Sequence, residues 1–243
     1  MFEQLAFKRL QLALLAIVTL IICYFSLQSM RANAWYFSSL NTVQELSNTS
    51  LLDAPEVYNN ELNKAQNAIK LAIELEPEHA HYLHFLAYIK LLALANTDQA
   101  QTEQSKLDTE YKEIQSLLLH STQIRSSWAE TWIELAKVTS YQEGPSKQVL
   151  KYIDQAKKVG SYKLDVHLGI IEISLANWQH LPPEYKALYV NSLSMAAQYG
   201  YRFNHIYTIA KQLNQLPTLC MSLQFGAAYK KLKQRYIYRQ NCK

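Results

Sequence analysis

The chain has 243 residues, of which 49% are hydrophobic and 18% charged, and its formal net charge is +4. It contains only 5 glycines and 6 prolines, and neither GxGxxG nor GxxxxGK[ST], the loops with which nucleotide-binding folds approach a phosphate, occurs. A sandwich or barrel of short strands needs a turn about every 8–12 residues, and turn-forming residues are too few for that. The composition therefore excludes these classes and predicts an all-α protein of long helices.

The first predicted element is a membrane anchor over residues 10–29. Residues 10–27 carry no charge, and as a helix these 18 residues span about 27 Å, the thickness of a hydrocarbon core. Lys8 and Arg9 precede the run, and Arg31 is the only basic residue among the 36 that follow it. The positive-inside rule then places residues 1–9 in the cytoplasm as a short tail and the body on the other side.

A cleaved signal peptide is the alternative to this anchor. Ala32-Asn33-Ala34 is an A-x-A pattern that a signal peptidase could cut before Trp35. The apolar run is longer than the usual hydrophobic region of about 7–15 residues, however, and it ends in the bulky residues Tyr24 and Phe25. The sequence therefore favours an uncleaved anchor, followed by a membrane-proximal helix and loop over residues 30–54.

A helical domain is expected over residues 55–215, and its helices carry a degenerate repeat. A helix begins near Pro55 after the N-cap Asp53 and runs to about Leu75. Its small and bulky residues, followed by a proline, have the spacing of the second helix of a tetratricopeptide repeat (TPR); they are Ala65, Ile69, Ala72 and Pro77. A first helix of the next unit follows, with Leu83, Leu86 and Ala87.

A second copy of the pattern begins at Ala129 and continues with a partner helix that carries Val149, Ile153 and Ala156. The two copies are 49 residues apart, more than the usual period of about 34, because the polar segment Asn96–Asp108 is inserted. Further helices are expected over 164–178, 181–198 and 204–214. The predicted fold is thus a TPR-like α-solenoid of degenerate helical hairpins behind one transmembrane helix.

The repeat register predicts a face for contact with other proteins. The exposed face of the first helices would carry three residues in one unit and three counterparts in the next: His81, His84, Tyr88, Glu130, Ile133 and Lys137. The histidines, with Glu78 and His79, could instead hold a metal ion. No cysteine is near them and no catalytic elbow occurs in the chain, so we expect protein contact, no metal or cofactor and no enzymatic activity.

The C-terminal segment, residues 216–243, is predicted to be a basic amphipathic helix and tail. After Glu184 the chain has nine basic and no acidic residues, so this part carries +9 and the remainder −5. A helix over 218–239 would have an apolar stripe of Phe225, Tyr229, Leu232 and Tyr236. Its cations could contact an anionic glycan or lipid surface, or the stripe could simply pack on the body. The candidate contacts are Lys230, Lys231, Lys233, Arg235 and Arg239.

Outside the anchor the chain has only two cysteines, Cys220 and Cys242. In an oxidising compartment they could form a disulfide that ties the chain end to an earlier helix, or they could remain free thiols. Spacing alone leaves both alternatives open. The location outside the cytoplasm also argues against a nucleic acid as partner, despite the basic C-terminal segment.

Several segments together resemble the VpsP-like family of bacterial exopolysaccharide-biosynthesis proteins. They are the anchor running into AWY at 34–36, IELEPEHAHYLHFLA at 73–87, RSSWAETWIELA at 125–136 and ANWQHLPPEYKA at 176–187. The resemblance covers roughly residues 10–190. It implies a single-pass protein of the bacterial inner membrane with a periplasmic TPR-like region. It also implies an accessory role in polysaccharide synthesis or export, protein partners from that system, and no catalytic residue.

Overall fold

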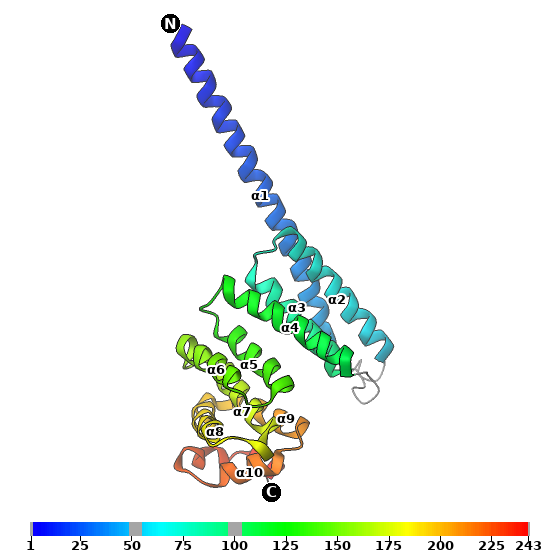
Figure 1. Ribbon diagram of the computed structural model, residues 1–243, viewed down its shortest axis with the longest axis vertical. Coiled ribbons are helices and arrows are strands. Elements are labelled where there is room, and N and C mark those ends of the chain that lie inside the picture. The colour runs from blue at the N-terminus through cyan, green and yellow to red at the C-terminus, as the bar shows by residue number, and fades with distance from the viewer. Residues whose placement is uncertain (1, 49–54, 97–103, 243) are drawn as a thin grey trace. The chain divides into compact units, whose positions relative to one another are not determined.

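The computed structural model describes residues 2–48, 55–96 and 104–242, and among these residues it contains helices and no β-strand (Figure 1). The all-α prediction is therefore confirmed. The chain forms two compact units, Met1–Thr102 and Glu103–Lys243. The predicted helical domain of residues 55–215 is thus divided between the two units. The predicted N-cap Asp53 lies outside the described residues.

The first unit consists of α1 (Phe2–Asn48), α2 (Pro55–Leu75) and α3 (Ala80–Ala95). α1 is continuous over 47 residues, so the predicted anchor and the described part of the membrane-proximal segment are one helix (Figure 1). From Ala32 onward the buried residues of α1 are seven, four and three positions apart, so they lie on one face of the helix. These buried residues are Ala32, Ser39, Val43 and Leu46, and this part of α1 packs against α2.

The repeat residues of the first unit pack as their sizes predict. On α2, Ala65, Ile69 and Ala72 are all almost fully buried. On α3, which packs against α2, Leu83 and Leu86 are buried as well. Small side chains let helices approach closely, while larger ones fill the space between them, so this alternation stabilises the helix pair.

The second unit begins with five helices: α4 (Gln104–Ile124), α5 (Ala129–Glu143), α6 (Lys147–Gly160), α7 (Leu164–Ala176) and α8 (Pro183–Ala196). α5 packs against α4, α6 and α7, and α7 packs against α8. Their shared core holds the expected repeat residues of α5 and α6, namely Ala129, Ala136, Val149, Ile153 and Ala156. The helices expected over 164–178 and 181–198 are therefore present with nearly the predicted bounds.

Short helices follow: η2 (Trp178–His180) before α8, then η3 (Ala197–Asn204), α9 (His205–Gln212), α10 (Leu216–Gln224), η4 (Ala227–Tyr229), α11 (Lys230–Lys233) and α12 (Tyr236–Cys242). They surround a second core to which α7 and α8 also contribute. That core includes Ile171, Tyr189, Phe203, Leu219, Leu223, Tyr229, Leu232 and Tyr238.

The prediction of one amphipathic helix over 218–239 is wrong. The helix ends at Gln224, because Phe225 is extended and Gly226 has φ 114°, a conformation that favours glycine. The apolar stripe is divided as a result. Tyr229 and Leu232 are only 5% and 3% exposed, whereas Phe225 and Tyr236 are 71% and 76% exposed. Half of the stripe is core, and half faces solvent.

Candidate functional site

The first half of α1 is a candidate membrane span. Every residue from 9 to 27 is exposed, and the segment is apolar and long enough to cross a membrane by length and composition. Among soluble proteins, a contiguous run of large exposed apolar side chains marks a surface that another apolar phase covers. The structure is therefore consistent with a single-pass membrane protein.

The beginning of α3 is tied to α1 through an aromatic cluster. The hydroxyl of Tyr36 and Nε2 of His81 lie 2.6 Å apart and share a hydrogen bond. The Tyr36 ring also stacks on Tyr82, with centroids 5.4 Å apart, and meets the edge of Phe85. Burial raises the pKa of Tyr36, so its hydroxyl stays protonated at neutral pH. His81 therefore helps to join the helices of the first unit.

The two other residues expected on this part of the contact face are less enclosed. His84 is half-buried and Tyr88 is 40% exposed. No group of three or more His, Cys, Asp or Glu side chains among the described residues is arranged to hold a metal ion. Within the first unit, Tyr88 is thus the most accessible member of the predicted face.

In the second unit, one member of the predicted face is buried. Ile133 is 2% exposed, because Gly169 of α7 packs directly on it, so it does not belong to an exposed face as predicted. Glu130 lies at the start of α5 and forms an ion pair with Lys163, with 2.5 Å between Oε1 and Nζ. The six residues of the predicted face belong to different units, three to each.

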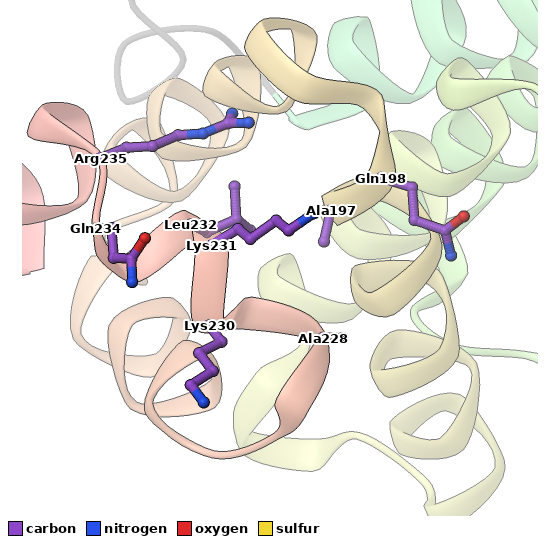
Figure 2. Close-up of a pocket in the computed structure, with 8 residues that line it drawn as sticks. All are labelled: Ala197, Gln198, Ala228, Lys230, Lys231, Leu232, Gln234 and Arg235. Atoms are coloured by element: carbon purple, nitrogen blue, oxygen red, sulfur yellow. The ribbon is translucent and has the colours of Figure 1, made fainter.

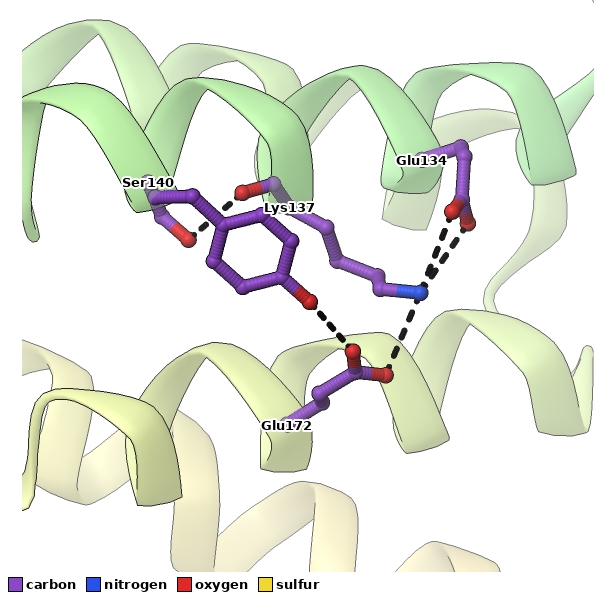
Figure 3. A network of polar contacts seen from close by, with 5 residues as sticks. Glu134, Lys137, Ser140 and Glu172 are labelled. Atoms are coloured by element: carbon purple, nitrogen blue, oxygen red, sulfur yellow. Dashed lines mark hydrogen bonds and ion pairs between the residues drawn. The ribbon is translucent and has the colours of Figure 1, made fainter. Parts of the chain in front are cut away.

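Lys137 lies at the centre of a polar network between α5 and α7 (Figure 3). Its Nζ is 3.1 Å from Glu134 Oε1 and 3.2 Å from Glu172 Oε2. Tyr141, on the same face of α5, donates its hydroxyl to Glu172 Oε1 at 2.5 Å. Burial by itself lowers the pKa of Lys137, but the two carboxylates outweigh this effect and raise it. Lys137 therefore remains charged and links the two helices.

Glu172 and Tyr141 were absent from the predicted face. Glu172 is 35 positions from Lys137 in the sequence, and only the packing of α7 on α5 brings the two together. The repeat register could have indicated this pair, because it predicts that α5 and α7 are neighbouring helices. Polar residues on their facing sides are then candidates for contact. The network fixes how α5 and α7 pack on each other. Its side chains are partly accessible, with exposed fractions of 17% for Lys137 and 19% for Glu172.

Some of the C-terminal cations lie around a cavity of about 830 Å³ between η3 and the η4–α11 turn (Figure 2). Three of the predicted contacts, Lys230, Lys231 and Arg235, line it together with the amides of Gln198 and Gln234. The remaining lining residues are apolar, and no acidic side chain is among them. The sequence predicts these cations on the surface of one helix, whereas in the structure three of them surround a cavity.

The two other predicted cations do not line this cavity. Lys233 donates from Nζ to the backbone oxygen of Gln224 at 3.0 Å, and Arg239 donates to that of Gln234 at 3.0 Å. Both side chains satisfy carbonyl oxygens at the ends of short helices, a position where cations stabilise the helix end.

Cys220 of α10 and Cys242 of α12 are joined by a disulfide, with their Cα atoms 5.3 Å apart. The bond closes a loop over 22 positions that contains η4, α11 and Arg235, and so all three cations of the cavity wall. Of the two alternatives left open by the sequence, the structure has the disulfide. Cys23, in the exposed part of α1, is a free thiol.

Comparison of the sequence with models of protein families gives no match, and comparison with characterised proteins finds no similar sequence.

Proposed function

We propose that this protein is a membrane-anchored accessory protein in exopolysaccharide synthesis or export. Its N-terminal tail would lie in the bacterial cytoplasm, α1 would cross the inner membrane, and the helical body would act in the periplasm through contacts with other proteins of the system. It would catalyse no reaction itself and need no cofactor. The resemblance of residues 10–190 to VpsP-like proteins motivates the pathway.

The observation that carries the proposal is the continuity of α1. The helix leaves its exposed apolar half and enters the folded unit without a break, and Gln28 Nε2 then donates to the backbone oxygen of Leu75 at 2.6 Å. Further along α1, Ser39 Oγ donates a hydrogen bond to the backbone oxygen of Ala65 at 2.7 Å. Because packed helix, and not a linker, joins the first unit to the anchor, that unit is held close to the membrane surface. Partner proteins of a membrane-bound assembly system would be contacted at this surface.

Two further observations support the compartment and the mode of action. A disulfide such as Cys220–Cys242 persists in oxidising compartments, of which the bacterial periplasm is one. The packing of α5 on α6 and α7 buries small and large residues alternately, as helical-hairpin repeats do. Repeats of this kind bind other proteins along the face formed by their first helices. In the first unit that face would include Tyr88, and in the second unit Tyr141, one turn from Lys137, would be a separate contact point.

Deletion of the gene tests the pathway. We expect the amount or the chain length of surface polysaccharide to fall, and expression of the full chain to restore it. A body that lacks residues 1–27 but is exported by another signal should fail to restore it. Unchanged polysaccharide in the deletion strain would contradict the proposal.

Photo-crosslinking in cells tests the mode of action. A photoreactive amino acid in place of Tyr88 or Tyr141, which are each 40% exposed, should trap a protein of the polysaccharide system. The matched control is Val190 on α8, which is 59% exposed and belongs neither to the predicted face nor to the Lys137 network. Equal cross-linking of the same protein from Val190 would count against this face.

A further inference from the structure

The cavity between η3 and the η4–α11 turn has the features of a ligand pocket. Its volume of about 830 Å³ is within the range of about 300–1,000 Å³ that small-molecule sites occupy. Gln234 supplies an amide donor and acceptor, Gln198 lines the edge of the hollow, and Ala197, Ala228 and Leu232 supply an apolar wall. From this lining we propose that the pocket binds an acidic saccharide unit, a sugar that carries a carboxylate or a phosphate.

The charge of the pocket selects an anion. Lys230, Lys231 and Arg235 are the charged residues in its wall, and no Asp or Glu occurs anywhere after Glu184 to neutralise them. Within the described part of the chain, neither lysine has an ion pair or hydrogen bond. Like charges held around a hollow repel each other and focus a positive potential there, and an anionic ligand relieves the repulsion.

The cations are held in place by the backbone around them. Arg235 donates from one terminal nitrogen to the backbone oxygen of Gly200 at 2.7 Å, which leaves other guanidinium N–H groups for a ligand. The buried side chains of Tyr229 and Leu232 fix α11, from which Lys230 and Lys231 project. Figure 2 shows Lys231 extending toward Ala197 while Lys230 points in another direction. Lys231 and Arg235 are therefore the expected direct contacts with the anionic group.

A sugar fits this site better than an inorganic ion or a flat membrane surface. A phosphate alone would fill little of the volume and would leave the amide of Gln234 unused. Tyr201 lies beside the pocket, with its ring 5.7 Å from the guanidinium carbon of Arg235, and it is 87% exposed. An exposed aromatic ring with a polar edge offers a face on which the C–H groups of a pyranose can stack. Charge, an amide and an aromatic face are together the chemistry of an acidic saccharide.

Calorimetry on the full chain in an uncharged detergent tests the proposal. The probes are a tetramer of galacturonic acid, glucose 6-phosphate, a neutral glucose tetramer and inorganic phosphate. We expect an acidic sugar to bind, the neutral tetramer not to bind, and affinity to fall as salt is added. The double variant Lys230→Gln, Lys231→Gln should weaken binding at least tenfold, as should Lys231→Glu alone. The matched control is Lys186→Gln, Lys211→Gln, which removes two exposed charges outside the pocket and should change affinity less than twofold.

Each other outcome overturns the proposal in a different way. Equal loss of affinity in the two double variants would show that only net charge matters. If inorganic phosphate bound as tightly as the acidic sugars, the pocket would be an anion site without preference for a saccharide. Binding only to nanodiscs that contain phosphatidylglycerol, and to neither acidic sugar, would assign the cations to a lipid surface. All these measurements use purified protein, so they stand or fall separately from the role in polysaccharide export proposed above.

Discussion

Gly169 of α7 lies directly on Ile133 of α5, so closely that a Cβ atom added to Gly169 would come within 2.3 Å of Ile133 Cγ1. Ile133 is 2% exposed, and its neighbours in the same core come from α5, α6 and α7. The absence of a side chain at position 169 therefore lets the two helices approach. This close approach also brings Lys137 of α5 within reach of Glu172 of α7.

Gly169→Ala should destabilise the second unit. In a helix without this contact, alanine would be more stable than glycine by about 1 kcal/mol. Here overpacking dominates, and we expect the free energy of unfolding to fall by about 1–3 kcal/mol in urea titration. The added Ile133→Ala substitution removes the clashing Cγ1 atom. The double variant should therefore lose less stability than the two single losses added together, and strict additivity would refute the contact.

Lys137→Met should destabilise the α5–α7 pair more than removal of an exposed lysine. Glu134 and Glu172 would be left facing each other without a cation, and loss of one partner of an enclosed pair costs up to about 3–5 kcal/mol. Because these side chains are partly accessible, we expect about 2 kcal/mol. Lys151→Met, at an exposed position on α6, is the matched control and should change stability by less than about 0.5 kcal/mol.

The difference in stability between wild type and Lys137→Met should depend on pH, because the pKa of Lys137 is raised in the folded protein. A raised pKa means that the folded protein holds the proton more tightly than the unfolded chain does. The stabilisation is therefore complete below the pKa of an unfolded lysine, about 10.4, and it is lost as the pH rises further. The gap in unfolding free energy between wild type and Lys137→Met should be constant between pH 6 and about pH 9 and narrow above about pH 10. A constant gap at pH 11 would contradict the assignment.

His167 should make the protein less stable in acid. Burial lowers its pKa, and nearby Lys157 lowers it further, although a hydrogen bond to the backbone oxygen of Ser161 at 3.0 Å acts in the opposite direction. The neutral form is thus favoured in the folded state, so its contribution is present above about pH 6.5 and lost as the pH falls. Unfolding at pH 7 and pH 5 should show a steeper loss for wild type than for His167→Gln. His205→Gln, at an exposed position on α9, should leave the wild-type slope unchanged.

Reduction of the Cys220–Cys242 disulfide should loosen the wall of the cationic pocket. Closing a loop of this length contributes about 3 kcal/mol by restricting the unfolded chain. In Cys220→Ser we expect faster cleavage by trypsin after the basic residues of α11 and α12, with the earlier helices still protected. Cys23→Ser, which alters the free thiol in α1, is the control. Identical cleavage patterns in the two variants would show that the disulfide does not hold this segment.

The mature protein should retain its N-terminus. The A-x-A pattern at 32–34 lies within the continuous helix α1, and Ala32 is fully buried in the first unit. A peptidase needs an extended backbone at its cleavage site, which this helix does not present. We expect mass spectrometry of protein from membranes to find residues 10–31 still joined to the body. A mature N-terminus at Trp35 would contradict both the anchor and the proposed function.

Local periodicity determined much of this fold. The spacing of Ala65, Ile69 and Ala72 predicts a buried helix face because residues three and four apart lie on the same side of an α-helix. Pro55 and Pro183 stand in the first turns of α2 and α8, where a missing N–H costs nothing. These signals depend only on near neighbours, so α2, α3 and α5–α8 could be placed from the sequence, together with the apolar run of α1.

The rest was decided by contacts between residues far apart in the chain. The stripe of Phe225, Tyr229, Leu232 and Tyr236 has helical spacing, yet Gly226 breaks the helix and the core takes only the middle two side chains. An amphipathic pattern is the same whether a helix is continuous or broken, since it records side chains and not the backbone turn between them. The ion pair of Lys137 with Glu172 and the hydrogen bond of Arg235 to Gly200 likewise depend on how helices distant in the sequence pack together. The sequence by itself thus determined the helical class, the apolar run of α1 and the excess of positive charge. Tertiary structure alone decided that three of those charges surround a cavity.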